Sequence, residues 1–125
     1  MTLGVVEVAR VYGLRPRSGE YRILVDRLWP RGLSKQALDC DEWLKTVAPS
    51  NALRKWYGHD PERFSDFALR YGSELASEAA STELARLRTV ALEQGLLLLT
   101  ATRELQFSAA GILAEILTSP NARAD

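Results

Sequence analysis

The segment from Leu96 to Thr100 constrains the fold of this chain most strongly. Its four consecutive leucines are apolar on both faces of an extended strand, so helices must cover the strand. An amphipathic helical pattern that begins near Ser81 or Thr82 ends at Gly95, directly before this strand, and a second one over roughly 106–117 follows it. This order of helix, strand and helix is typical of α/β proteins with a parallel sheet.

Two more strands are predicted near the start of the chain, over 5–12 and 21–28. About eight residues connect them, which is short for a parallel crossover with its own helix. The pair is therefore either an antiparallel hairpin or a parallel pair joined by an extended link. With 125 residues, we expect one small three-layer α/β domain with a mostly parallel sheet of three or four strands flanked by helices. An α+β fold with an N-terminal hairpin is the alternative.

Three helices are predicted between these strands and the leucine-rich strand. Residues 39–42 read as a capping box that opens a short helix through Trp43 and Leu44. Ser50 is placed to cap a second short helix that ends at Gly58. Asp60 and the proline after it are typical of the start of a third helix. The apolar stripe of that helix consists of Phe64, Phe67, Ala68, Tyr71 and Leu75.

The second strand ends in side chains that a purely structural turn does not need. Asp26, Arg27, Trp29 and Arg31 follow one another within six positions, at the edge where open α/β sheets bind their ligands. The planar guanidinium group matches phosphate or carboxylate, and an indole can stack on a planar group. In the alternative interpretation, Asp26 pairs with Arg27, Arg31 or Arg63 to hold the turn, and Trp29 belongs to the core.

His59 is the only histidine of the chain and therefore the only side chain whose ordinary pKa lies near neutrality. It is either a general base or anion contact, or a residue of the turn before the helix at Asp60, where we expect its ring to form one hydrogen bond. One histidine and one cysteine exclude the usual zinc sites. Asp26 and Glu104 could hold magnesium through waters, but nothing in their spacing requires it. No phosphate-binding loop is present, so we predict neither a metal nor a cofactor.

Charge is uneven along a chain whose formal net charge is zero. Seven basic residues face two acidic ones between Arg10 and Lys35, whereas acidic residues predominate after that. A basic segment suits an anionic partner, and an exposed patch of Arg15, Arg17, Arg22 and Lys35 would allow weak, non-specific contact with nucleic acid. No apolar run is long enough to cross a membrane and the single cysteine excludes an internal disulfide, so we expect a cytoplasmic protein.

The run from Asp26 to Lys35 resembles the signature of the YeaO-like branch of domain-of-unknown-function family 488. Further blocks agree over 43–50 and 53–63, followed by two aromatic residues, so the resemblance covers about residues 5 to 75 and continues more weakly to residue 117. It implies a small cytoplasmic bacterial α/β protein without an established activity.

The resemblance also marks a departure after the leucine-rich strand. Relatives typically carry an aromatic residue, then a basic residue followed by Asp, then a His-Asn-like pair. The same places here hold Thr100, the pair Arg103 and Glu104, and the pair Phe107 and Ser108. If the His-Asn pair carries chemistry in the relatives, this chain has lost it.

Two classes of function remain open on the sequence. The first is a protein that binds a small phosphorylated or nucleotide-like ligand at the carboxyl ends of the strands, either as an enzyme or without catalysis. The second is a noncatalytic module whose basic N-terminal segment contacts nucleic acid or a protein. The candidate ligand-binding residues are Asp26, Arg27, Trp29, Arg31, Lys35, His59, Arg63 and Arg103.

Overall fold

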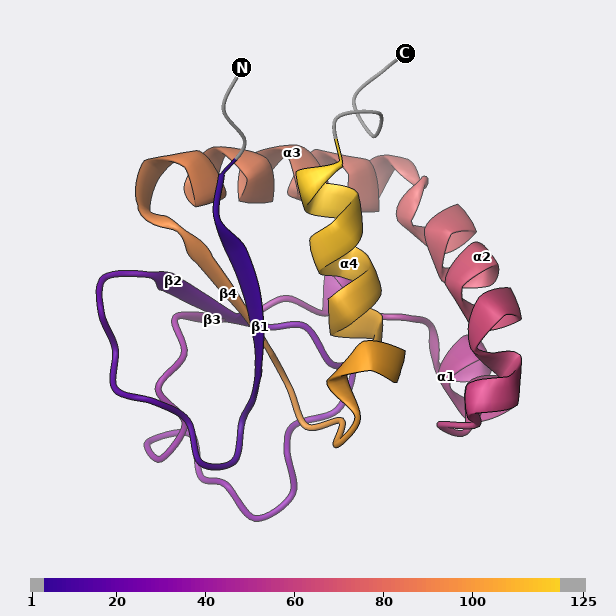
Figure 1. The fold of residues 1–125 in the computed structure, drawn as a ribbon, viewed down its shortest axis with the longest axis horizontal. Coiled ribbons are helices and arrows are strands. Elements are labelled where there is room, and N and C mark those ends of the chain that lie inside the picture. Colours follow the sequence, from indigo (N-terminus) through magenta and orange to yellow (C-terminus); the bar gives the residue numbers. More distant parts are fainter. Residues whose placement is uncertain (1–3, 120–125) are drawn as a thin grey trace.

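A four-stranded, all-parallel sheet forms the centre of the computed structural model, which describes residues 4–119 (Figure 1). Its strand order is β1-β4-β2-β3. The strands are β1 (Val6–Arg10), β2 (Tyr21–Leu24), β3 (Glu42–Trp43) and β4 (Leu96–Thr100). The α/β prediction is confirmed.

The leucine-rich strand β4 lies between β1 and β2 and pairs with both of them in parallel. β1 and β2 are therefore not neighbours, and the alternative of an N-terminal hairpin is wrong. The chain returns from the end of β1 to the start of β2 through an extended link without a helix of its own. β4 occupies the centre because all five of its residues are buried, which no edge strand would allow.

The helices cover one face of the sheet (Figure 1). They are α1 (Asn51–Tyr57), α2 (Phe64–Leu75), α3 (Glu78–Gln94) and α4 (Ala109–Thr118). Their apolar faces pack against Ile23, Val25, Leu96 and Leu98. The second face carries Leu24, Leu97 and Leu99 and is covered by Val11, Leu38 and the long loops around them. Within the described chain the third layer therefore consists of loops, and the expected helices on this face are not found.

Most of the predicted helix boundaries are confirmed. The hydroxyl of Ser50 accepts from the Leu53 amide at the start of α1, and Gly58 ends this helix in the left-handed conformation. Asp60 caps a short 3-10 turn, Pro61–Arg63, that leads into α2. Two boundaries differ: Ser77 caps α3, which therefore starts before Ser81, and α4 starts at Ala109, after a 3-10 turn over Leu105–Phe107.

The predicted helix at 39–44 is wrong, because Glu42–Trp43 forms the edge strand β3 beside β2. The side chains of the supposed capping box bind residues that are distant in the sequence. Asp39 pairs with Arg17, Asp41 accepts from the backbone amide of Arg22, and Glu42 accepts from Arg86 on α3. These contacts, together with the strand pairing, outweigh the local helical preference of the segment.

Candidate functional site

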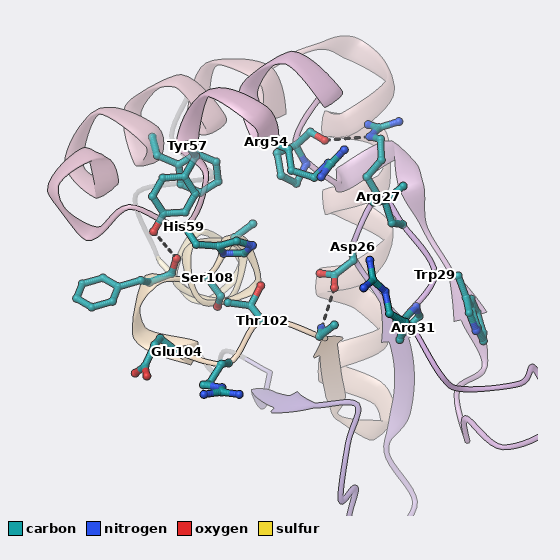
Figure 2. Close-up of a pocket in the computed structure, with 18 of the residues that line it drawn as sticks. Asp26, Arg27, Trp29, Arg31, Arg54, Tyr57, His59, Thr102, Glu104 and Ser108 are labelled. Carbon is teal, nitrogen blue, oxygen red and sulfur yellow. Dashed lines mark hydrogen bonds between the residues drawn. The ribbon is translucent and has the colours of Figure 1, made fainter.

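A cavity of about 510 Å³ opens at the carboxyl ends of β2 and β4. Figure 2 shows Asp26, Arg27 and Arg31 on one wall and Tyr57, His59 and Ser108 on the facing wall. Open α/β sheets bind ligands at this edge. The residues that line it are Tyr12, Asp26, Arg27, Leu28, Trp29, Pro30, Arg31, Pro49, Arg54, Tyr57, His59, Pro61, Phe67, Ala101, Thr102, Arg103, Glu104, Phe107, Ser108 and Ala109.

Asp26 is the most firmly held polar residue of the cavity. Its Oδ1 accepts from the Thr100 hydroxyl at 2.7 Å, and its Oδ2 accepts from the Ala101 amide at 2.8 Å. The Trp43 indole N–H donates to the Asp26 carbonyl at 2.7 Å. The end of β4 therefore holds the carboxylate of Asp26, and β3 holds its main chain, where β2 ends.

Burial raises the pKa of Asp26, although both of these hydrogen bonds and the nearby His59 charge act to lower it. No arginine or lysine among residues 4–119 forms an ion pair with this carboxylate. The alternative interpretation, in which Asp26 pairs with Arg27, Arg31 or Arg63, is therefore wrong. Asp26 is a partly buried carboxylate without a cationic partner among the described residues, in a cavity rich in arginine.

The side chain of Arg27 binds main-chain carbonyl groups of the protein. Its Nε donates to the carbonyl of Pro49 at 3.0 Å, and its Nη2 lies 3.3 Å from the carbonyl of Ala48 and 3.4 Å from that of Lys45 (Figure 2). These bonds fasten segment 45–49, which includes the 3-10 turn Lys45–Val47, to the end of β2. Arg27 builds the rim of the cavity and keeps little donor capacity for a ligand.

Arg54, on α1, is a cavity residue that the sequence reasoning missed. Its Nη2 donates to Asn51 at 3.3 Å, whereas its Nε is buried and has no hydrogen-bond partner within residues 4–119. A signal was present: Arg54 lies three residues before Tyr57, on the same face of a capped helix. Since Tyr57 is buried, the neighbouring arginine must also face the protein interior.

Most hydroxyl and indole groups of the cavity already donate to main-chain carbonyls. Tyr12 donates to Arg31 and Tyr57 donates to Phe107, each at 2.7 Å. The Ser108 hydroxyl donates to Leu105 and accepts from Gly111, which caps α4. The Trp29 indole N–H donates to Leu33, and its ring packs edge-on against Trp43 at 5.3 Å. Trp29 is thus half-buried in the second core while it lines the cavity.

His59 lies at the mouth of the cavity. It is exposed, it has a positive φ of 57°, and its ring centroid is 6.0 Å from that of Tyr57. The prediction that the His59 ring forms a stabilising hydrogen bond is wrong, because the ring has no hydrogen-bond partner in the described chain. Arg31, Arg103 and Glu104 are likewise exposed lining residues, and their side chains bind no partner among residues 4–119.

Lys35 and Arg63 lie outside the cavity lining. Arg63 stacks over the Trp56 ring, and its Nε lies 3.7 Å from Asp60. The basic N-terminal segment is also internally paired: Arg15 binds Glu7, and Arg17 binds Asp39 and Asp41. Arg22 is buried and binds Glu20 at 2.6 Å. Carboxylates from neighbouring segments thus neutralise three of the four residues of the supposed basic patch.

The comparisons with known proteins show the family of this chain. A family model described as "Inactive DUF488-N3 subclade" matches residues 5–125. The chain belongs to this subclade. The resemblance to the YeaO-like branch is confirmed, because the chain is 40% identical over 114 residues to the uncharacterized protein YeaO of Escherichia coli, covering 91% of this chain and 97% of that protein.

Mycobacterial relatives are closer in sequence. An uncharacterized protein of Mycobacterium tuberculosis, Rv3073c, is 47% identical over 115 residues, covering 90% of this chain and 92% of the relative. A protein of Mycobacterium bovis, Mb3100c, matches to the same extent. No solved structure matches this chain.

Two structural findings concern metals and membranes. Residues 4–119 contain no group of three or more histidine, cysteine, aspartate or glutamate side chains that could hold a metal ion. No helix in this range is both long and apolar enough to cross a bilayer.

Burial raises the pKa of the Cys40 thiol, which makes this residue a poor nucleophile.

Proposed function

We propose that this protein binds a small phosphorylated or nucleotide-like anion in the cavity at the carboxyl ends of β2 and β4, without chemical turnover and in the cytoplasm. The observation that carries the proposal is the buried Nε of Arg54, which has no partner among the described residues. A buried donor that lacks a hydrogen bond costs about 1–3 kcal/mol. Since the same guanidinium group lines the cavity, an anionic oxygen there would give Arg54 an acceptor.

The charge of the lining supports the same ligand class. Four arginines, Arg27, Arg31, Arg54 and Arg103, face two carboxylates, Asp26 and Glu104. The N-terminal end of α4 also borders the cavity, since Ser108 and Ala109 line it, and the positive end of a helix dipole attracts anions. Guanidinium groups that bind phosphate in the forked geometry each contribute about 1.5–3 kcal/mol.

The absence of turnover is supported by the far wall of the cavity. Phe107 and Ser108 stand where relatives typically carry a His-Asn-like pair. Phenylalanine cannot transfer a proton, and the Ser108 hydroxyl is already used as the cap of α4. The matching subclade is itself described as inactive. Binding without catalysis is the role that these residues still allow.

Thermal unfolding in the presence of phosphate, pyrophosphate and adenosine 5′-monophosphate tests the proposal. A ligand at one hundred times its Kd stabilises the folded state by about 2.7 kcal/mol, which for a domain of this size raises the Tm by roughly 8 °C. Phosphate also stabilises proteins without specific binding. The informative quantity is therefore the difference between the wild type and an Arg54→Gln variant.

Arg15→Gln is the matched control, because Arg15 is exposed, lies outside the cavity lining and belongs to the supposed basic patch. We expect Arg54→Gln to abolish the ligand-specific rise in Tm and Arg15→Gln to retain it. Equal rises in all three proteins would overturn the proposal. Tight, salt-sensitive binding of an oligonucleotide that Arg15→Gln weakens would favour the nucleic-acid module instead.

A further inference from the structure

We propose that the ligand is a phosphorylated sugar or polyol, whose phosphate meets Arg54 and whose hydroxyl groups donate to Asp26. This assignment rests on the proposed function, and it adds the chemistry of the part of the ligand that does not carry the phosphate. It follows from the polar groups that remain available once the internal hydrogen bonds of the cavity are taken into account.

Asp26 retains acceptor capacity toward the cavity. A carboxylate offers about four lone-pair sites, and each Asp26 oxygen accepts one hydrogen bond, from Thr100 or Ala101. The side chain lines the cavity and points toward His59 across it (Figure 2). The hydroxyl groups of Tyr12, Tyr57 and Ser108 are already bound to carbonyls, so a donor that enters the cavity can fill the remaining sites.

An anion alone would fit this arrangement poorly. Phosphate bound at Arg54 would share the cavity with the carboxylate of Asp26, which forms no ion pair among residues 4–119. A neutral donor between them removes the conflict, since it satisfies the carboxylate without adding charge. An ammonium group would suit Asp26 but would be repelled by the arginines of the same cavity, so hydroxyl groups are the better match.

The size of the cavity agrees with a ligand larger than phosphate. Its volume of about 510 Å³ lies in the range of small-molecule sites. The lining includes Leu28, Pro49, Phe67 and Ala101, which provide apolar contact for a carbon skeleton. A sugar phosphate places an anion and several neutral donors on one such skeleton.

The test compares inorganic phosphate, ribose and ribose 5-phosphate by isothermal titration calorimetry of the full chain. A hydrogen bond to a charged group corresponds to a change in affinity of about tenfold or more. We expect ribose 5-phosphate to bind at least about tenfold more tightly than phosphate. Adenosine 5′-monophosphate, measured alongside, shows whether the sugar also carries a base in this cavity.

Two matched variants separate hydrogen bonding from charge. Asp26→Asn removes a negative charge and an acceptor, so we expect tighter phosphate binding and weaker ribose 5-phosphate binding. Glu104→Gln also removes a carboxylate from the lining, but it should change both affinities by the same factor. A merely structural role of Asp26 would instead weaken both ligands together.

The outcomes distinguish the two proposals. Binding of phosphate with no further gain from ribose 5-phosphate would overturn the sugar assignment and leave the anion site intact. An Asp26→Asn variant that keeps the full preference for ribose 5-phosphate would also overturn it. If neither phosphate nor any phosphorylated compound binds the wild type, the proposed function itself fails.

Discussion

Removal of one hydroxyl group from Tyr57 tests how the cavity wall that contains Tyr57, Phe107 and Ser108 is held together. Tyr57 lies on α1 and is only 4% exposed, and its hydroxyl donates to the carbonyl of Phe107 at 2.7 Å, fifty residues further along the chain. Its ring also stacks on Phe67 at 4.0 Å, which Tyr57→Phe preserves. The substitution therefore removes a single bond between α1 and the turn before α4.

Tyr12 provides the matched comparison. Its hydroxyl also donates to a main-chain carbonyl at 2.7 Å, that of Arg31, and it also lines the cavity, but the residue is 37% exposed. Water can replace the lost donor at an exposed carbonyl and cannot do so as well at a buried one. We expect Tyr57→Phe to lower the free energy of unfolding by about 1.5 kcal/mol, and Tyr12→Phe by less than about 0.5 kcal/mol.

Urea denaturation of the wild type and both variants measures these differences. Neither substitution changes the surface area exposed on unfolding appreciably, so the m-values of the three proteins should agree. The lower free energy of unfolding of Tyr57→Phe should therefore appear as a lower urea concentration at the midpoint. Equal losses in the two variants would show that burial does not determine the cost of this bond. A larger loss for Tyr12→Phe would refute the reasoning outright.

Three further predictions concern the rest of the fold. The hydrogen bond from Arg22 lowers the pKa of Glu20 from 4.5 to about 2. The stability that this group contributes is therefore present above pH 4.5 and is lost as the pH falls toward 2. In an acid titration, Glu20→Gln should lose less free energy of unfolding over this range than the wild type. Leu98→Ala in the fully buried β4 should cost about 3 kcal/mol in urea denaturation, whereas Leu69→Ala, at a position 74% exposed, should cost little. His59→Gln should change stability by less than about 0.5 kcal/mol in the same assay, and a loss of 1 kcal/mol or more would show a contact that the structure lacks.

Local patterns were sufficient to predict several elements. Four consecutive leucines can be stable only between two apolar layers, which made the central strand and the α/β class predictable. Ser50 and Asp60 cap their helices through their own side chains, so these boundaries depend on residues within a few positions. The concentration of polar groups after β2 likewise pointed to the edge of the sheet where the cavity lies.

Other features depend on partners that lie far away in the sequence. Glu42–Trp43 became a strand because β2 offered an open edge and because Asp39, Asp41 and Glu42 found basic or amide partners elsewhere. The leucine pattern predicts that β4 lies inside the sheet, but no local pattern shows that β1 and β2 pair with opposite edges of it.

The roles of the arginines were decided in the same way. From the sequence, Arg27 is the obvious ligand for an anion, but segment 45–49 brings three carbonyl groups to its guanidinium and occupies it. Arg54 shares one side of a short helix with Tyr57, but only the folded structure shows that its Nε is buried without a hydrogen-bond acceptor among residues 4–119. The sequence by itself determined the central strand, most helix boundaries and the edge at which a ligand would bind. Only the tertiary structure decided which cation remains available there, because hydrogen-bond donors are assigned by the neighbours that folding brings within reach.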